Sequence, residues 1–250
     1  MPLFETESLV LKSYSLSEAD RIVLFFTREH GLVRGVAKGA KRLKSRFGST
    51  LEPFSTVLLS YFQKENSELA SIQNVELIRS SFEQASIPAY LQTFAYMADL
   101  LSLFAPPHDP NEKLYRMVKA CVEVKLNTRD ELAALRLYFE IWLLRLGGFL
   151  PNWNACNDCG RLLEPKESTD VQAEFSLLCA GCRRSRSNQT ITGGQREVFH
   201  QVQRLSPADF LAAHSDKVED VQIVSSILKR VIANVIGKEV VNENSFAVNF

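Results

Sequence analysis

The sequence predicts an α+β chain in which a small β-barrel is followed by a helical domain, and a cysteine-bearing loop interrupts the helices. Three observations lead to this fold class. Short β-rich apolar runs fill the chain to about residue 76, the apolar period then becomes helical, and two cysteine pairs stand between two helical stretches. We expect an N-terminal domain at 1–80 and a helical domain at 81–250, with the insertion at 152–186.

The N-terminal region carries five candidate strands separated by turn-prone segments. Five short strands in a region of this size are typical of a small closed barrel, and an OB-type barrel is the simplest such fold. The candidate strands cover residues 8–11, 22–26, 32–36, 56–62 and 69–75.

Apolar residues recur at helical spacing after Pro88. Gly147 and Gly148, followed by Pro151, should end the third helix, because glycine can cap a helix and proline cannot continue it. Neither side of the cysteine loop has enough helices to bury its apolar faces, so we expect one interrupted helical domain. The helical stretches are 90–104, 114–122, 132–146, 195–205 and 218–236.

The overall composition is that of a globular protein, with 46% hydrophobic and 23% charged residues and a formal net charge of zero. No apolar run approaches the length of a membrane span. The N-terminal residues include Glu5 and no basic segment before an apolar core, so we expect no secretory signal and a cytoplasmic location.

Four of the five cysteines form two C-x-x-C pairs, with nineteen residues (160–178) between them. This spacing is typical of zinc ribbons, in which four thiolates close a tetrahedral shell and the metal is structural. Redox-active thiols are the alternative, but no βαβ pattern surrounds them. We therefore predict a structural Zn²⁺ ion held by Cys156, Cys159, Cys179 and Cys182. Cys121 lies on an apolar helical face and is expected in the core.

The segment between Glu29 and Glu52 contains no acidic residue and is strongly basic. Its glycines allow close backbone approach, and its cations suit contacts with phosphate oxygens. A merely solvated basic face is the alternative. The candidate phosphate-binding residues are Arg34, Lys38, Lys41, Arg42, Lys44 and Arg46. A second acid-free run, from Arg183 to Arg196, could extend this anion-binding surface or only aid solubility.

Four aromatic residues on the neighbouring candidate strands could stack on unpaired bases: Phe25, Phe26, Tyr61 and Phe62. Because strand side chains alternate in direction, we expect at least half of them to pack in the core instead. No phosphate-binding glycine loop for ATP, nucleophile–base pair or open metal site is recognisable, and the four histidines are scattered. We therefore predict no enzymatic activity, the alternative being a hydrolase with an unrecognised site.

Two blocks of the sequence resemble the RecO family of bacterial recombination mediators. The first runs from Gly35 to Phe47 and continues with Leu51-Glu-Pro-Phe54, and the second runs from Tyr138 to Pro151 and into Cys156-x-x-Cys159-Gly160. The opening residues 7–14 and Glu18-Ala-Asp-Arg21 also fit. The resemblance covers most of the chain and adds Arg21 to the candidate DNA-binding residues.

This resemblance implies an OB-fold, a helical domain interrupted by zinc, and DNA repair through the RecF pathway. Such proteins bind single- and double-stranded DNA, anneal complementary strands, and act with RecR and the C-terminal tail of single-stranded-DNA-binding protein to load RecA. We expect these partners, a functional link to RecF, and a nucleoid-associated cytoplasmic location. Not every family member keeps the four cysteines. The alternative function is a protein–protein adaptor whose helical domain docks repair partners without DNA binding.

Overall fold

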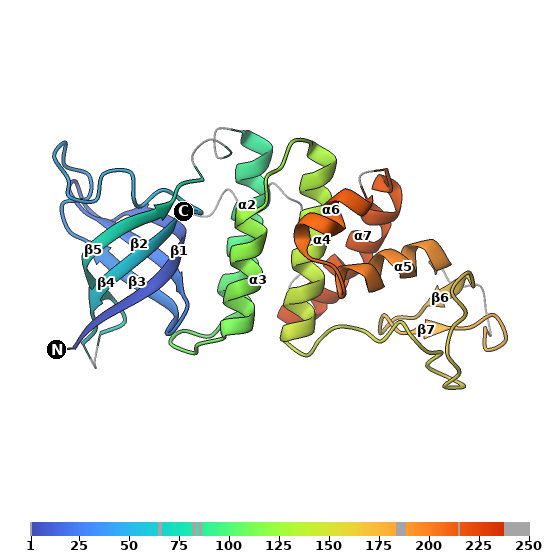
Figure 1. Cartoon of the computed structure of the whole chain (residues 1–250). Helices are drawn as coiled ribbons and strands as arrows, with labels where there is room; N and C mark the ends of the chain where they lie inside the picture. The colour runs from blue at the N-terminus through green and yellow to red at the C-terminus, as the bar shows by residue number, and fades with distance from the viewer. Residues whose placement is uncertain are drawn as a thin grey trace. The chain divides into compact units, whose positions relative to one another are not determined.

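The computed structural model describes residues 2–64, 67–81, 84, 87–183, 189–214 and 216–237. The chain divides into two compact units after Glu123. The first unit contains the barrel and the next two helices, and the second contains the remaining helices and the cysteines (Figure 1). This division differs from the expected domain boundary at 80–81, which stays a prediction.

Five strands form a closed barrel in the order β1-β2-β3-β5-β4, as predicted. The strands are β1 (Leu3–Ser15), β2 (Arg21–Thr27), β3 (Gly31–Ala37), β4 (Thr56–Phe62) and β5 (Ala70–Arg79). Neighbouring strands are antiparallel except β3 and β5, which are parallel. The long β1 closes the barrel because it pairs with both β2 and β4: Leu9 lies opposite Phe26 on one side and Thr56 on the other.

The barrel core combines inward-facing strand residues with two residues from the long loop between β3 and β4. Strand alternation places Val23 and Phe25 inside, and Phe47 and Leu51 of the loop join them. Each such large side chain contributes about 1.5–3 kcal/mol by leaving water. The loop that carries the basic residues is therefore anchored in the core at its C-terminal half.

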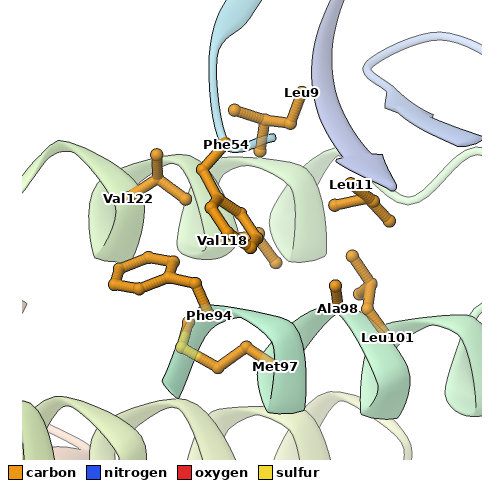
Figure 2. A pocket seen from close by; sticks show the side chains of 9 residues that line it. All are labelled: Leu9, Leu11, Phe54, Phe94, Met97, Ala98, Leu101, Val118 and Val122. Carbon is orange, nitrogen blue, oxygen red and sulfur yellow. The ribbon is translucent and has the colours of Figure 1, made fainter. Parts of the chain in front are cut away.

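Helices α2 (Pro88–Phe104) and α3 (Glu112–Glu123) pack in the same unit as the barrel. Figure 2 shows where apolar side chains from β1, from the end of the β3–β4 loop and from both helices converge. They surround a cavity of about 10 Å³ without polar lining, which is too small and too apolar to hold an ordered water. The lining residues are Leu9, Leu11, Phe54, Phe94, Met97, Ala98, Leu101, Val118 and Val122.

Phe54 connects the basic loop to these helices. Its backbone is left-handed, with φ 66°, a conformation that costs free energy in any residue with a Cβ atom. The backbone N–H of Phe54 donates to the Val10 carbonyl at 2.6 Å, and its ring lies 5.1 Å from the ring of Phe94. Tertiary contacts thus stabilise the strained backbone and fix the end of the loop.

The second unit contains α4 (Arg129–Leu146), α5 (Gly193–Val202), α6 (Pro207–His214) and α7 (Val218–Ile236). Capping boxes start α4 at Thr128 and α5 at Thr192. The expected start of the third helix, residue 132, lies three residues after the start of α4, because the first turn of α4 is polar. The expected fourth helix continued to residue 205, three residues beyond the end of α5. No helix was expected at α6, which has eight residues.

Three short strands lie within the cysteine insertion and just after it, in the order β7-β6-β8. They are β6 (Thr169–Val171), β7 (Leu177–Leu178) and β8 (Thr190–Ile191), which are too short to predict from periodicity. The insertion lies between α4 and α5, as expected. In the part of the chain that the structure describes, no helix has the length and apolar character needed to cross a membrane.

Candidate metal centre and nucleic-acid interface

The ligand atoms of Cys156, Cys159, Cys179 and Cys182 all lie within 4.8 Å of one another. The Sγ atoms of Cys159 and Cys179 are 3.9 Å apart. Four sulfurs around a tetrahedral ion with bonds of about 2.3 Å would be separated by about 3.8 Å, so the cluster has the right size for a metal ion. Among the described residues, this is the one such group of His, Cys, Asp or Glu side chains.

Both cysteine pairs form tight turns closed by backbone hydrogen bonds. Gly160 N–H donates to the Cys156 carbonyl at 3.0 Å, and Cys182 N–H donates to the Cys179 carbonyl at 3.1 Å. Gly160 has φ 73°, the left-handed conformation that glycine adopts without strain. Gly181, inside the second pair, has no positive φ, so this turn does not depend on a left-handed glycine.

Hydrogen bonds favour thiolates at the centre of the cluster. Burial opposes ionisation of Cys156, but backbone N–H groups of Cys159, Cys179 and Asp158 outweigh it and lower the pKa of Cys156 to about 6. The Cys179 N–H donates to the Cys156 Sγ at 3.4 Å. Because metals bind the deprotonated form of cysteine, this environment is suitable for a ligand.

Three residues outside the cysteine pairs hold the cluster in place. The Glu167 carboxylate accepts from both Nη atoms of Arg161, Nη1 at 3.0 Å, and from the Ala180 N–H at 3.4 Å. Arg161 follows the first cysteine pair and Ala180 lies inside the second, so Glu167 bridges the two. Buried Arg196 of α5 donates to the carbonyl oxygens of Glu164 and Glu167. No spacing pattern in the sequence indicates these contacts.

Trp153, just before the first cysteine pair, connects the start of the insertion to the segment that precedes the second pair. It is fully buried, its indole N–H donates to the Phe175 carbonyl at 2.9 Å, and its ring lies 4.2 Å from the ring of Phe199. The insertion is therefore attached to α5 through an aromatic contact as well as through Arg196.

The candidate phosphate-binding residues all lie on the barrel, and six of the seven are exposed; Arg21 is half-buried. Within the described residues none of them forms an ion pair with a carboxylate. Lys41 donates to Ser15 Oγ at 2.7 Å and to the Ser17 carbonyl at 2.9 Å. Arg46 donates to the Ile72 carbonyl at 3.3 Å and Arg21 to Ser13 Oγ at 3.4 Å. These three cations also position local structure.

The other four cations make no hydrogen bond or ion pair within the described part of the chain: Arg34, Lys38, Arg42 and Lys44. Arg34 lies on β3, and the rest belong to the β3–β4 loop. Unpartnered surface cations on one loop are available to an anionic ligand.

The second basic run, from Arg183 to Arg196, is less suited to binding an anionic ligand than its sequence suggested. Arg183 pairs with the buried Asp170 carboxylate at 2.6 Å, and Arg196 is 3% exposed. Arg184 and Arg186 lie outside the described residues. The two arginines that can be placed serve the insertion itself.

Three of the four candidate stacking aromatics are buried. Phe25 and Tyr61 belong to the barrel core, and Phe26 packs 5.7 Å from the ring of Tyr115 in α3. Only Phe62 is partly exposed. The expectation that at least half of these residues pack in the core is confirmed. Cys121 is also fully buried, as expected.

Family models match nearly the whole chain. The model described as Recombination protein O N terminal matches residues 1–81, and the model described as Recombination protein O C terminal matches residues 90–241. Their division falls close to the domain boundary expected from the sequence.

Two curated relatives match this chain over most of their length. A DNA repair protein RecO of Koribacter versatilis is 30% identical over 84% of this chain and 85% of its own length. One from Caldanaerobacter subterraneus is 32% identical over 87% of this chain and 90% of its own. With a closed five-stranded barrel, a helical region and a four-cysteine cluster in the expected order, these matches show that the chain belongs to the RecO family of DNA repair proteins.

Proposed function

We propose that this protein binds single- and double-stranded DNA through the β3–β4 loop of its barrel. The observation that carries the proposal is a set of four exposed cations without a hydrogen-bond or ion-pair partner among the described residues: Arg34 on β3, and Lys38, Arg42 and Lys44 on the loop that follows it. Lys41, Arg46 and Arg21 would add phosphate contacts while holding the loop and the adjacent strand. Contacts of this kind depend on backbone charge, so binding would be steeply salt-dependent and weakly sequence-selective.

The proposal includes a structural zinc ion in the four-cysteine cluster. Four thiolates fill a tetrahedral shell and leave no position for water or substrate, so the ion would stabilise the insertion and carry out no chemistry. Cys156 and Cys179 are buried, Cys182 is half-buried and Cys159 is exposed, so the site would lie at the surface of the insertion with two ligands buried. No enzymatic activity is required of the protein.

The wider role proposed is that of a recombination mediator in the RecF pathway. A surface that neutralises two repelling backbones and leaves base edges free would let complementary strands anneal. Family membership supports cooperation with RecR and with the tail of single-stranded-DNA-binding protein, and loading of RecA onto DNA. These partners would place the protein in the bacterial cytoplasm, on the nucleoid.

The test is fluorescence anisotropy of a labelled single-stranded oligonucleotide across a salt series. The triple variant Lys38→Gln, Arg42→Gln, Lys44→Gln removes loop cations whose side chains make no hydrogen bond or ion pair within the described residues, so folding should be unaffected. Loss of three phosphate contacts should reduce the log–log salt slope by about 2. The matched control, Lys113→Gln, Arg116→Gln, Lys125→Gln, removes the same charge from exposed positions outside the barrel.

Equal slopes for the two triple variants would place the DNA-binding surface elsewhere. Absence of any DNA binding by the wild-type protein would overturn the proposal and leave the adaptor function. Annealing of complementary strands at the wild-type rate by the loop variant would contradict the proposed annealing surface.

A further inference from the structure

The tip of the basic loop is a hydrogen-bonded turn with an apolar side chain at its corner. Ser45 N–H donates to the Arg42 carbonyl at 2.9 Å, which places Leu43 and Lys44 at the two central positions of the turn. Leu43 has a relative exposure of 102%, the highest of the exposed large hydrophobic residues of the described chain. Its side chain therefore makes essentially no contact with the protein.

Hydrogen bonds and core packing fix the chain on both sides of this turn. On its N-terminal side, Gly39 N–H donates to Asp20 Oδ1 at 2.8 Å and Lys41 N–H donates to the Ala19 carbonyl at 2.9 Å. On its C-terminal side, Phe47 and Leu51 are buried in the barrel core. The loop thus presents Leu43 from a preorganised position, which lowers the entropic cost of binding.

The residues beside Leu43 determine which ligand the tip suits. Arg42 and Lys44 flank it directly, and both side chains are exposed and make no hydrogen bond or ion pair within the described residues. An apolar side chain between two free cations matches a nucleic-acid strand, in which base surfaces lie between charged phosphates. Proteins that deform nucleic acids insert leucine and similar residues between bases in this way.

The buried aromatics strengthen this assignment. Of the four barrel aromatics that could stack on bases, Phe25, Phe26 and Tyr61 are at most 2% exposed and Phe62 is partly exposed. The three buried ones cannot stack on bases without opening the barrel or its packing against α3. The apolar side chain that the structure places among free cations is Leu43.

We propose that Leu43 is a base-contacting residue that inserts against or between the bases of a strand whose phosphates Arg42 and Lys44 hold. This inference rests on the proposed function, because it names the base contact made by the same loop. It assigns the loop two separable parts, a charge-dependent one for the backbone and an apolar one for the bases.

The experiment compares binding of two labelled oligonucleotides of equal length and charge, one of thymidines and one of abasic sites. Wild-type protein should prefer the thymidine strand. Leu43→Ala should lose about 3- to 10-fold affinity for that strand and bind the abasic strand as wild type does. Its salt slope should not change, because no phosphate contact is removed. A strand carrying 2-aminopurine should show a smaller fluorescence rise with Leu43→Ala than with wild type.

The matched control is Leu3→Ala. Leu3 is also exposed on the barrel, at 57%, but pairs with Phe62 at the end of β4 farthest from the basic loop, which enters that strand at Thr56. Wild-type affinity and 2-aminopurine signal in Leu43→Ala, with weakened binding in the triple basic variant, would overturn this inference and leave the proposed function standing. Failure of the proposed function would instead appear as absent binding to both strands by the wild-type protein.

Discussion

Glu167 accepts hydrogen bonds from Arg161, beside the first cysteine pair, and from the backbone N–H of Ala180 inside the second pair. The Arg161 guanidinium lowers the pKa of the Glu167 carboxyl, although partial desolvation acts against it. One carboxylate thus connects two turns that are distant in sequence. It holds the four thiols at metal-binding distance without being a ligand.

Glu167→Gln should weaken metal binding. Residues that orient ligands typically contribute about 10- to 100-fold to metal affinity, and the substitution removes the charge that holds Arg161. The measurement is competition for Zn²⁺ with a metallochromic chelator. Glu174→Gln, an exposed residue of the same insertion, serves as control. Equal affinities for the two variants would show that the bridge does not position the thiols.

Removal of the metal ion should change the fluorescence emission of Trp153. In a Trp142→Phe background, Trp153 is the remaining tryptophan, and its indole is buried between Phe175 and Phe199. Because metal binding stabilises loops of this kind, a strong chelator should loosen the insertion and shift the emission to longer wavelength. Added Zn²⁺ should reverse the shift. An unchanged spectrum, at confirmed metal loss, would contradict a structural role for the ion.

The contact of Glu7 with α3 should make the barrel unit sensitive to acid. Burial raises the pKa of Glu7, but hydrogen bonds from Lys119 at 2.7 Å and Tyr115 at 3.1 Å outweigh it and lower the pKa from its ordinary 4.5. The folded state therefore holds the carboxylate charged where the unfolded chain begins to protonate. This stabilisation is complete above the ordinary pKa and is lost as pH falls through the lowered one.

Glu7→Gln should accordingly reduce the free energy of unfolding by about 1 kcal/mol near neutral pH, a modest amount because the pair is partly exposed. The difference from wild type should shrink as pH falls through the lowered pKa. Urea denaturation at several pH values measures it, with exposed Glu18→Gln as control. A difference that does not depend on pH would mean that packing, and not charge, explains the loss.

Substitutions at two glycines should distinguish the free-energy cost of backbone strain from the cost of a steric clash. Gly31 at the start of β3 has φ 63°, and a Cβ atom there would overlap with the Asp109 carbonyl oxygen and lie 2.8 Å from the Asp109 nitrogen. Gly48 has φ 48° and nothing within 4 Å of such an atom. Gly31→Ala should therefore destabilise by about 3 kcal/mol and Gly48→Ala by about 1 kcal/mol. If both variants lose the same free energy of unfolding in urea denaturation, the segment 106–110 can move away from the added methyl group of Gly31→Ala at little cost.

Much of the architecture follows from local patterns. Short β-rich apolar runs separated by turn-prone segments located all five barrel strands. Apolar residues at period 3.6 located α2, α3, α4 and α7, because each of these helices buries one face along its length. The C-x-x-C spacing identified the cysteine cluster for a comparable local reason: two thiols on one tight turn already face the same way. Where local signals are weak, prediction failed: no helix was expected at the eight-residue α6.

Contacts between distant segments were decided only by the tertiary structure. Sequence composition made Phe25, Phe26 and Tyr61 suitable for stacking on bases, but barrel closure and the packing of α3 bury all three. Likewise, nothing in the spacing of Arg161, Glu167 and Arg196 indicates that they meet around the cysteines. The sequence by itself indicated the barrel, the cysteine cluster and the basic loop, because short-range patterns and spacing encode them. The resemblance of two sequence blocks indicated the family. Which side chains remain free to contact a ligand depends on the side of each strand that long-range packing covers, and that is fixed only when the chain folds.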